Sequence, residues 1–289
     1  MKKILITGAN SYVGTSFEKW LSQWLDKYHV DTIDMIDGTW REKSFTGYDV
    51  VFHVAGIAHV SADPSKKDMY YKINRDLAIE TAEKAKSDGV KQFIFMSSMI
   101  IYGADEPLGK EKIITKETQP APADFYGDSK LQADLAIQKL ADDNFIVSIM
   151  RPPVIYGPGC KGNFPKLLKL AKYALIFPNI ENRRSMIYID NFTECVRLII
   201  DGMAGGIFFS QNSDYVSTKE VVITCRQMMH KKTILFWIPN FTYEIIGKIK
   251  YVNKAFGSKV YESNEELLDY QLIDFNSSII KMLNHDSSF

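Results

Sequence analysis

The first half of the chain alternates short hydrophobic runs with longer segments of helical periodicity. Runs rich in β-branched and aromatic residues, which indicate buried strands, occur at 4–6, 30–33, 50–54, 92–96 and 145–150. Apolar residues recur at helical spacing between these runs, and helices are predicted over 74–86 and 126–140. Strands separated by helices of this length pair in parallel through right-handed crossovers. The pattern therefore predicts an α/β fold with a doubly wound parallel sheet.

This alternation stops at residue 151, after which proline and glycine become frequent. A helix is predicted over 164–173 from its apolar spacing. Ser217 and Glu220 have the spacing of a capping box, which predicts the start of a further helix. The second half is therefore predicted to be less regular than the first.

The length of 289 residues suffices for one large or two modest domains. We expect a sheet domain over 1–155 and a smaller part over 156–289, with segments around 185–210 returning to the sheet domain. The 35 basic and 35 acidic residues give a net charge of +0, which argues against nucleic-acid binding driven by overall positive charge. The composition is that of an ordinary soluble enzyme.

Other features of the composition bear on compartment and membrane contact. Cys160, Cys195 and Cys225 are odd in number and show no repeating spacing, which indicates a reducing compartment rather than a disulfide framework. No window approaches the ~18 apolar residues of a membrane helix. The most hydrophobic stretch, 234–252, is interrupted by proline and charged residues, so we expect it to be buried or to face another subunit rather than a membrane. The sequence predicts a cytoplasmic protein without a membrane span.

The segment TGANSYVG, at 7–14, follows the first predicted strand and opens a helix. Gly8 suits a tight turn, and Gly14 lets the helix approach the strand closely. A helix N-terminus at this position favours a phosphate, since its backbone amides and its dipole both attract negative charge. Ser11 stands where glycine is usual, but it is small, and its hydroxyl could donate to a phosphate oxygen. A plain strand-to-helix turn is the alternative interpretation.

An acidic residue at the expected distance extends this motif. Asp34 lies twenty positions beyond Gly14, where a carboxylate can bind the ribose hydroxyls of a dinucleotide. Because a carboxylate repels a 2′-phosphate, NAD is favoured over NADP. Arg41, in the following loop, could reach a 2′-phosphate, and Asp31 and Asp37 are neighbouring candidates for the acidic role.

A second cluster of polar residues indicates catalysis. Tyr126 and Lys130 are four positions apart and would lie on one helix face, while Ser98 ends the fourth predicted strand. A phenol has a pKa near ~10. We expect a nearby ammonium and a positive nicotinamide ring to lower the pKa of Tyr126. Tyr126 would then take a proton from a substrate hydroxyl that Ser98 holds, while the cofactor accepts hydride.

Taken together, these motifs resemble the extended short-chain dehydrogenases/reductases, in particular the NAD-dependent nucleotide-sugar epimerase/dehydratase family. The resemblance covers roughly residues 1–220 and implies a Rossmann-like fold. The matching segments are TGANSYVG (7–14), Asp34, HVAG (53–56), Asn74, SSMIIYG (97–103), YGDSK (126–130), RPPVIYGPG (151–159) and RRSMIYIDN (183–191).

The resemblance also implies roles for individual residues. Ser98, Tyr126 and Lys130 are the implied catalytic set. The implied cofactor-binding residues are Gly8, Asn10, Ser11, Tyr12, Val13, Gly14, Asp34, Ala55, Gly56, Asn74, Tyr126, Lys130 and Pro153. The implied substrate-binding residues are Ser98, Tyr126, Asn163 and Arg184, with Arg184 on the diphosphate; a surface cation beside Arg183 is its alternative reading. No metal site is expected, because the histidines and cysteines lack metal-ligand spacing.

Three departures from the family pattern narrow the choice of reaction. Met99 and Ile100 stand where the 4,6-dehydratases carry an Asp-Glu pair, and neither can transfer a proton. Val154 replaces a sugar-contacting asparagine, a role that Asn163 could take with help from Lys161, although Asn163 is equally suited to a helix cap. The last arginine is Arg226, so the second diphosphate-binding arginine of many relatives is altered or absent.

These features favour an NAD-dependent 4-epimerase of a UDP-sugar, either UDP-glucose/galactose or the N-acetyl analogue, in surface-polysaccharide or nucleotide-sugar metabolism. The alternatives are an NAD(P)H-dependent 4-keto nucleotide-sugar reductase and a non-catalytic dinucleotide-binding regulatory protein. The resemblance further implies a homodimer, with helices that include 126–140 packed across a two-fold axis.

Overall fold

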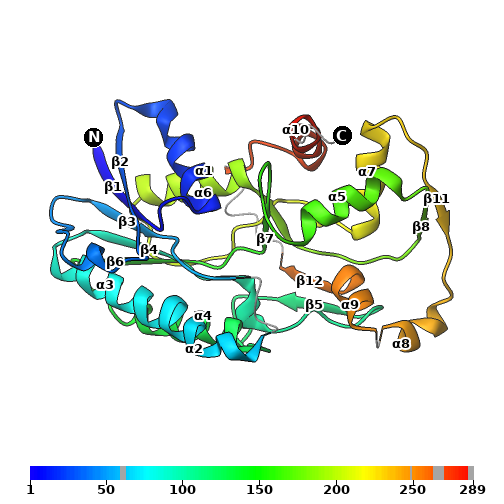
Figure 1. Cartoon of the computed structure of the whole chain (residues 1–289), viewed down its shortest axis with the longest axis horizontal. Coiled ribbons are helices and arrows are strands. Elements are labelled where there is room, and N and C mark those ends of the chain that lie inside the picture. Colours follow the sequence, from blue (N-terminus) through cyan, green and yellow to red (C-terminus); the bar gives the residue numbers. More distant parts are fainter. Residues whose placement is uncertain (59–62, 248, 263–269, 286–289) are drawn as a thin grey trace. The chain divides into compact units, whose positions relative to one another are not determined.

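A six-stranded, entirely parallel sheet forms the core of the N-terminal part of the chain (Figure 1). Its strand order is β10-β6-β4-β3-β1-β2. The central strands are apolar on both faces, as expected for a parallel sheet covered by helices. The predicted α/β class and the five predicted strands are confirmed. The strands are β1 (Lys2–Thr7), β2 (Tyr28–Ile33), β3 (Val50–His53), β4 (Gln92–Met96), β6 (Ile146–Met150) and β10 (Gly206–Phe208).

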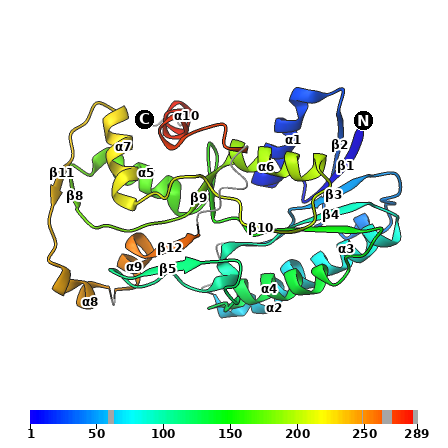
Figure 2. The same ribbon diagram turned by 180° about the vertical axis from the view of Figure 1, so that it is seen from behind.

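Helices cover both faces of this sheet. In the two opposite views, α1 and α6 lie on one face, and α3 and α4 lie on the other (Figure 1 and Figure 2). Trp20 Nε1 donates to Glu194 at 2.9 Å, which ties α1 to α6. The bounds of these helices are α1 (Tyr12–Leu21), α2 (Lys67–Tyr70), α3 (Leu77–Ser87), α4 (Phe125–Gln138) and α6 (Ile189–Asp201).

One predicted helix differs from the observed structure. Residues 74–86 were expected to form a single α-helix, but the chain forms a π-helical turn at Tyr71–Asp76 before α3 begins. π-helical turns are rare and are common at functional sites. This turn carries Asn74, which is fully buried.

The second part of the chain contains three small parallel ribbons. They pair β7 (Val154–Tyr156) with β9 (Met186–Tyr188), β8 (Ile176–Pro178) with β11 (Ile234–Phe236), and β5 (Glu111–Ile114) with β12 (Ser258–Tyr261). The helices are α5 (Asn163–Tyr173), α7 (Thr218–Met228), α8 (Tyr243–Ile246), α9 (Lys250–Phe256) and α10 (Phe275–His285). The predicted capping box is present, since Ser217 and Glu220 each bond the other's backbone amide at the start of α7.

The computed structural model describes residues 1–58, 63–247, 249–262 and 270–285. The chain divides into two compact units, each assembled from three segments. Unit 1 comprises Met1–Gly103, Gln119–Pro153 and Phe192–Ser210, and unit 2 comprises Ala104–Thr118, Val154–Asn191 and Gln211–Phe289. The expected cofactor and substrate domains remain a prediction about function. Among the described residues, no helix combines the length and the apolar character needed to cross a membrane.

The hydrophobic stretch at 234–252 does not form a buried core segment. Ile234, Leu235, Phe236 and Trp237 are all exposed, as are Phe241, Ile245 and Ile249. The expectation of burial within the fold is therefore wrong. Contact with another subunit remains a prediction.

Candidate active site

The turn between β1 and α1 depends on two glycines. Gly8 has φ +98°, and a Cβ there would lie 2.8 Å from the backbone nitrogen of Ala55, so no side chain fits. A Cβ on Gly14 would lie 2.6 Å from Ser11 Oγ and 3.2 Å from side-chain atoms of Ile6 and Val54. Both glycines are therefore required for close packing of strand and helix, as the sequence predicts.

Ser11 caps α1. Its backbone is extended, with φ −72°, which any residue can adopt, and its Oγ accepts a hydrogen bond from Gly14 N at 3.1 Å. Asn10 takes the left-handed conformation with φ +65°, and Tyr12 and Val13 open the helix. The amides of the first helical turn have no partner within the helix, so this end can bind an anion.

Asp34 directly follows β2 and is exposed. The alternative carboxylates are engaged elsewhere: Asp31 accepts from Tyr48 Oη at 2.7 Å, and Asp37 caps the turn at Thr39. Asp34 Oδ1 accepts from Ile36 N at 2.9 Å, an Asx turn that fixes the carboxylate at the strand end. The geometry therefore favours Asp34 for the ribose.

Arg41, the residue that could bind a 2′-phosphate, is held by another group. Its guanidinium forms a two-pronged ion pair with Glu80 and stacks over the Trp40 ring at 4.7 Å. The hydrogen bonds to Glu80 raise the pKa of Arg41 above its ordinary value. This pairing favours NAD over NADP, in agreement with the choice made from Asp34.

The carboxyl end of β3 meets the helices through Asn74. Asn74 Oδ1 accepts from Ile57 N at 2.9 Å, and its Nδ2 donates to Ile57 O at 3.0 Å. A Cβ on Gly56 would lie 3.0 Å from Asn74 Oδ1 and 3.2 Å from Lys130 Nζ, and Ala55 adjoins this position. The structure therefore brings Gly56, Asn74 and Lys130 together, and the lack of a side chain at residue 56 permits this close approach.

Lys130 is buried on α4. Its Nζ donates to Met96 O at 2.8 Å and lies 5.0 Å from the centre of the Phe95 ring. Burial lowers the pKa of Lys130 to about 8. His53 is buried between Phe93 and Phe95, and its Nδ1 shares a hydrogen bond of 2.7 Å with Thr7 Oγ1. Burial lowers the pKa of His53 to about 3. The histidine is therefore neutral, which fits a structural role.

Tyr126 and Ser98 are the predicted reactive pair. Ser98 starts the turn after β4, and its Oγ accepts from Ile100 N at 3.2 Å. Burial raises the pKa of Tyr126 to about 12, the neighbouring Tyr70 also raises it, and the nearby Ser98 hydroxyl opposes the shift. The prediction that Lys130 lowers the pKa of Tyr126 is therefore wrong for the protein without its cofactor. Burial dominates because the ammonium is directed to the Met96 carbonyl.

A buried ion pair fixes the elements that carry these groups. Asp134, one turn beyond Lys130 on α4, accepts from Arg151 Nε at 2.9 Å and Nη2 at 2.8 Å. The same carboxylate accepts from Ser97 Oγ at 2.6 Å. Arg151 also donates to Tyr102 Oη at 2.7 Å. Residue types give little sign of this network, because neither partner belongs to a motif of charged residues.

Arg151 directly follows β6 and leads into the predicted nicotinamide contact. Pro153 is buried at the end of the segment that follows β6. The preceding carbonyl, Pro152 O, accepts from Met99 N at 2.9 Å, so the two loops at this sheet end are joined. Met99 is buried, and neither it nor Ile100 carries a proton-transferring group.

Unit 2 contains a pocket of about 290 Å³ that brings together Asn163 and Arg184, the two residues predicted to bind substrate. Lys166 and Lys254 also line it, and among its described lining residues there is no carboxylate. Its wall is otherwise mainly apolar. The full lining comprises Val154, Asn163, Phe164, Lys166, Leu167, Leu170, Arg184, Met186, Val216, Ser217, Thr218, Val221, Lys254 and Ala255.

Arg184 is partly buried at this pocket. It donates to Gly257 O at 3.0 Å and to Lys254 O at 2.8 Å, and it lies 3.1 Å from Asp105. Burial lowers the pKa of Arg184, and Asp105 opposes that shift. Arg183, in contrast, is an exposed cation that pairs with Glu111, so the surface-cation interpretation fits Arg183 and not Arg184.

Two other predictions concern this pocket. Gly162, not Asn163, is the cap residue of α5, so the alternative cap role for Asn163 is wrong. Arg226 donates to Ala171 O at 2.9 Å and to Lys232 O at 2.6 Å and does not line the pocket. Lys254 is the cation from the C-terminal region that does, and it was missed because a single lysine carries no motif.

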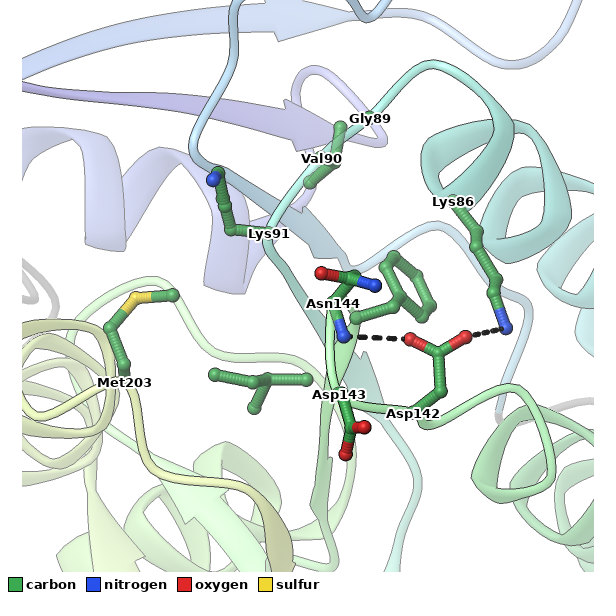
Figure 3. A pocket seen from close by; sticks show the side chains of 10 residues that line it. Lys86, Gly89, Val90, Lys91, Asp142, Asp143, Asn144 and Met203 are labelled. Carbon is green, nitrogen blue, oxygen red and sulfur yellow. Dashed lines mark hydrogen bonds and ion pairs between the residues drawn. The ribbon is translucent and has the colours of Figure 1, made fainter.

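A larger hollow, of about 460 Å³, lies in unit 1 at the amino ends of β4 and β6 (Figure 3). Asp142 crosses it to pair with Lys86 at 2.6 Å and accepts from Asn144 N at 2.9 Å. Ligands of open α/β sheets bind at the carboxyl ends of strands. This hollow is therefore not the cofactor site.

Comparison with known proteins agrees with this arrangement. The model of the NAD dependent epimerase/dehydratase family matches residues 4–208. A UDP-glucose 4-epimerase of Vibrio cholerae is 31% identical over 271 residues, covering 86% of this chain and 82% of the relative. The N-acetyl-alpha-D-glucosaminyl-diphospho-ditrans,octacis-undecaprenol 4-epimerase of Escherichia coli O157:H7 is 26% identical over 274 residues, covering 85% and 80%.

The fold has close structural counterparts. The UDP-glucuronic acid 4-epimerase of Bacillus cereus, solved in complex with NAD, superposes with a TM-score of 0.75 at 17% identity. The match covers 98% of this chain and 96% of that one.

Proposed function

Because the chain belongs to the NAD dependent epimerase/dehydratase family, we propose that it is an NAD-dependent 4-epimerase of a UDP-sugar. The observation that carries this proposal is that Ser98 and Tyr126 come together at the carboxyl ends of the strands, with buried Lys130 one helical turn beyond Tyr126 on α4. A protein that only binds a dinucleotide has no need of a phenol and an ammonium at this position.

The residues of unit 1 fit NAD. The two glycines leave space at the turn, the first turn of α1 offers amides for the pyrophosphate, and Asp34 suits the ribose hydroxyls. Gly56 leaves room beside Asn74 and Lys130. We assign cofactor contacts to these residues, to Ala55 and to Pro153. When bound, NAD accepts a hydride from the sugar and returns it.

The residues of the chain supply the accompanying proton transfer. Ser98 holds the sugar 4-hydroxyl by hydrogen bonding, and Tyr126 removes its proton and later restores it. Burial holds Tyr126 protonated in the protein alone, so it becomes an effective base only when positive charge is added beside it. Lys130 is mostly charged at neutral pH, since its pKa is about 8, but in the protein alone it does not lower the pKa of Tyr126. The positive nicotinamide ring is the charge that cofactor binding would add.

We assign the diphosphate of the substrate to the pocket of unit 2. Arg184 is aimed by three backbone and side-chain partners, and guanidinium geometry suits phosphate oxygens. Lys166 and Lys254 add positive charge, and Asn163 can donate an amide hydrogen bond. The apolar wall suits the face of a uracil ring.

The chemistry disfavours two other reactions. Elimination of water needs a further acid and base at the sugar, but Met99 and Ile100 can supply neither. A reductase would use the same three catalytic residues with net consumption of a reduced cofactor. The pairing of Arg41 with Glu80 and the position of Asp34 support retained NAD, which suits epimerisation because the cofactor is regenerated each cycle.

We also propose that the protein forms a homodimer through unit 1. Met69 on α2 and Leu135 on α4 are both exposed, although these two helices pack against one another. Exposed apolar residues on neighbouring helices are suited to a second copy of the same pair. Molar mass from light scattering, for the wild type and for Leu135→Glu, tests this assignment.

The experiment that tests the function measures conversion of UDP-galactose to UDP-glucose, and of the N-acetyl analogues, without added cofactor. Turnover with NAD retained on the purified protein is expected. Tyr126→Phe should lower kcat by about 10²–10⁴-fold, while Tyr173→Phe, at a position that is 77% exposed, should leave it unchanged. Strict dependence on added NADPH with a 4-keto sugar would instead establish a reductase.

A further inference from the structure

Unit 2 exposes an unusually apolar edge. We use the term apolar edge for Tyr173, Leu175, Ile176, Ile234, Leu235, Phe236, Trp237, Phe241, Ile245 and Ile249, all of which are exposed. They belong to β8, β11, α8 and the segments beside them. In both views these three elements follow one side of the unit (Figure 1 and Figure 2).

The ribbon of β8 and β11 explains why these side chains share a surface. Ile234 pairs with Ile176 in parallel register, and side chains alternate along a strand, so Ile176, Ile234 and Phe236 lie on one face. On the opposite face Phe177 is buried and packs against Phe256 at 5.9 Å. The unit itself thus covers Phe177, whereas Ile176, Ile234 and Phe236 are left in water, and Leu235, on the same face as Phe177, stays 40% exposed.

Three aromatic side chains, Tyr173, Trp237 and Phe241, are among the most exposed residues of the apolar edge. Trp237 is 70% exposed and Phe241 is 81% exposed. Scattered apolar residues are normal on a surface, but a contiguous patch with several aromatic residues marks an interaction site. Trp and Tyr are enriched where proteins meet the headgroup region of a membrane.

The charge around the apolar edge is predominantly positive. Among residues whose side chains the structure describes, segments 161–180 and 229–254, which contain the apolar edge, hold seven lysines and one glutamate, although the whole chain is neutral. Lys172 lies over the Tyr173 ring, 5.8 Å from its centre, and Lys231 Nζ donates to Lys172 O at 3.1 Å. Lysine side chains therefore border the aromatic residues directly.

We propose that the apolar edge docks on an anionic lipid bilayer. Aromatic and aliphatic side chains enter the headgroup region, and the surrounding lysines pair with anionic lipids. A second copy of the chain fits less well, because a symmetric contact would bring two lysine-rich surfaces together, and in these segments a single carboxylate, that of Glu244, could neutralise them. The net neutrality of the chain then reflects a separation of charge between this surface and the rest.

The apolar edge also adjoins the pocket of unit 2. Leu170 lines that pocket and is itself exposed, one helical turn before Tyr173 on α5. Docking would therefore hold the pocket close to the membrane surface. The docking proposal does not depend on the proposed reaction, since it rests on the exposure and charge of residues outside unit 1.

Co-sedimentation of the full-length protein with vesicles tests the proposal. We expect binding to vesicles of phosphatidylcholine mixed with phosphatidylglycerol, little binding to phosphatidylcholine alone, and weaker binding at high salt. Trp237→Ser with Phe241→Ser should weaken binding by about tenfold or more. The matched control is Leu25→Ser, which removes an equally exposed apolar residue from unit 1.

A charge variant distinguishes electrostatic attraction to anionic lipid from non-specific hydrophobic adsorption. Lys231→Gln with Lys232→Gln should weaken binding by about 30-fold, whereas Lys19→Gln with Lys27→Gln in unit 1 should have little effect. Thermal unfolding shows whether each variant is folded. Failure of the wild type to sediment with anionic vesicles overturns the proposal. The proposal is also overturned if the protein binds no lipid and the variant with Trp237→Ser and Phe241→Ser has a lower molar mass than the wild type. The apolar edge would then be the contact with a second copy of the chain.

Discussion

The buried carboxylate of Asp134 offers the sharpest test of how the site is held. Asp134→Leu removes the partner of Arg151, whose side chain is 6% exposed, and leaves a guanidinium buried without its counter-charge. It also removes the acceptor of Ser97, next to the proposed catalytic serine. Breaking a buried pair from one side costs about 3–5 kcal/mol. With an m-value of about 3 kcal/mol/M, the urea midpoint should fall by about 1–1.7 M.

The companion variant distinguishes a charge effect from a packing effect. Asp134→Leu combined with Arg151→Met replaces the pair by apolar side chains of similar size, and should recover most of the lost free energy of unfolding. Asp142→Asn removes an exposed partner of Lys86 and should cost below about 1 kcal/mol. Urea unfolding followed by far-UV circular dichroism measures all three. The reasoning fails if Asp134→Leu stays within about 1 kcal/mol of wild type, or if the double variant is as unstable as the single one.

Three further predictions concern the cofactor site. Ser11→Gly should keep NAD affinity within a few-fold, while Ser11→Leu should abolish it; calorimetric titration measures both, and equal binding by the leucine variant would place the phosphates elsewhere. Glu80→Gln should release Arg41 and improve NADP affinity relative to NAD by up to about fivefold, so an unchanged ratio of Kd values would contradict the pairing argument. Burial lowers the pKa of Lys130 from 10.5 to about 8, so the charged lysine destabilises the folded state. This destabilisation is complete below pH 8 and decreases as the pH rises towards 10.5, where the lysine is neutral in the unfolded state too. The stability advantage of Lys130→Met, about 3 kcal/mol at pH 7, should therefore shrink by pH 10 in urea unfolding of the cofactor-free protein, and a constant difference would show that the lysine is solvated.

Much of unit 1 is predictable from the sequence because its strands are continuous apolar runs and its site residues end those runs. Gly8, Ser98 and Tyr126 each lie at a boundary that the pattern marks. The structure was needed to choose Asp34 over Asp31, because that choice depends on a hydrogen bond from a tyrosine seventeen residues away.

Other features could not be read from the sequence because they depend on environment rather than on residue type. The pKa of Tyr126 is raised instead of lowered, since burial outweighs an ammonium whose direction is set by a backbone carbonyl. Three-residue strands such as β8 and β11 carry no periodic signal, and the exposure of Trp237 follows from their pairing. The role of Asp134, on α4, depends on Arg151, which the segment after β6 contributes.

The last strand of the large sheet is added late in synthesis. β6 ends at residue 150, but β10, the strand that completes its free side, begins at residue 206. The ribosome therefore makes residues 151–205, which takes about 3–11 s, while the nascent sheet presents an open backbone edge to other chains. An open edge of this kind can pair with another chain. How well this protein reaches its native state will therefore depend on how quickly translation supplies residues 206–208.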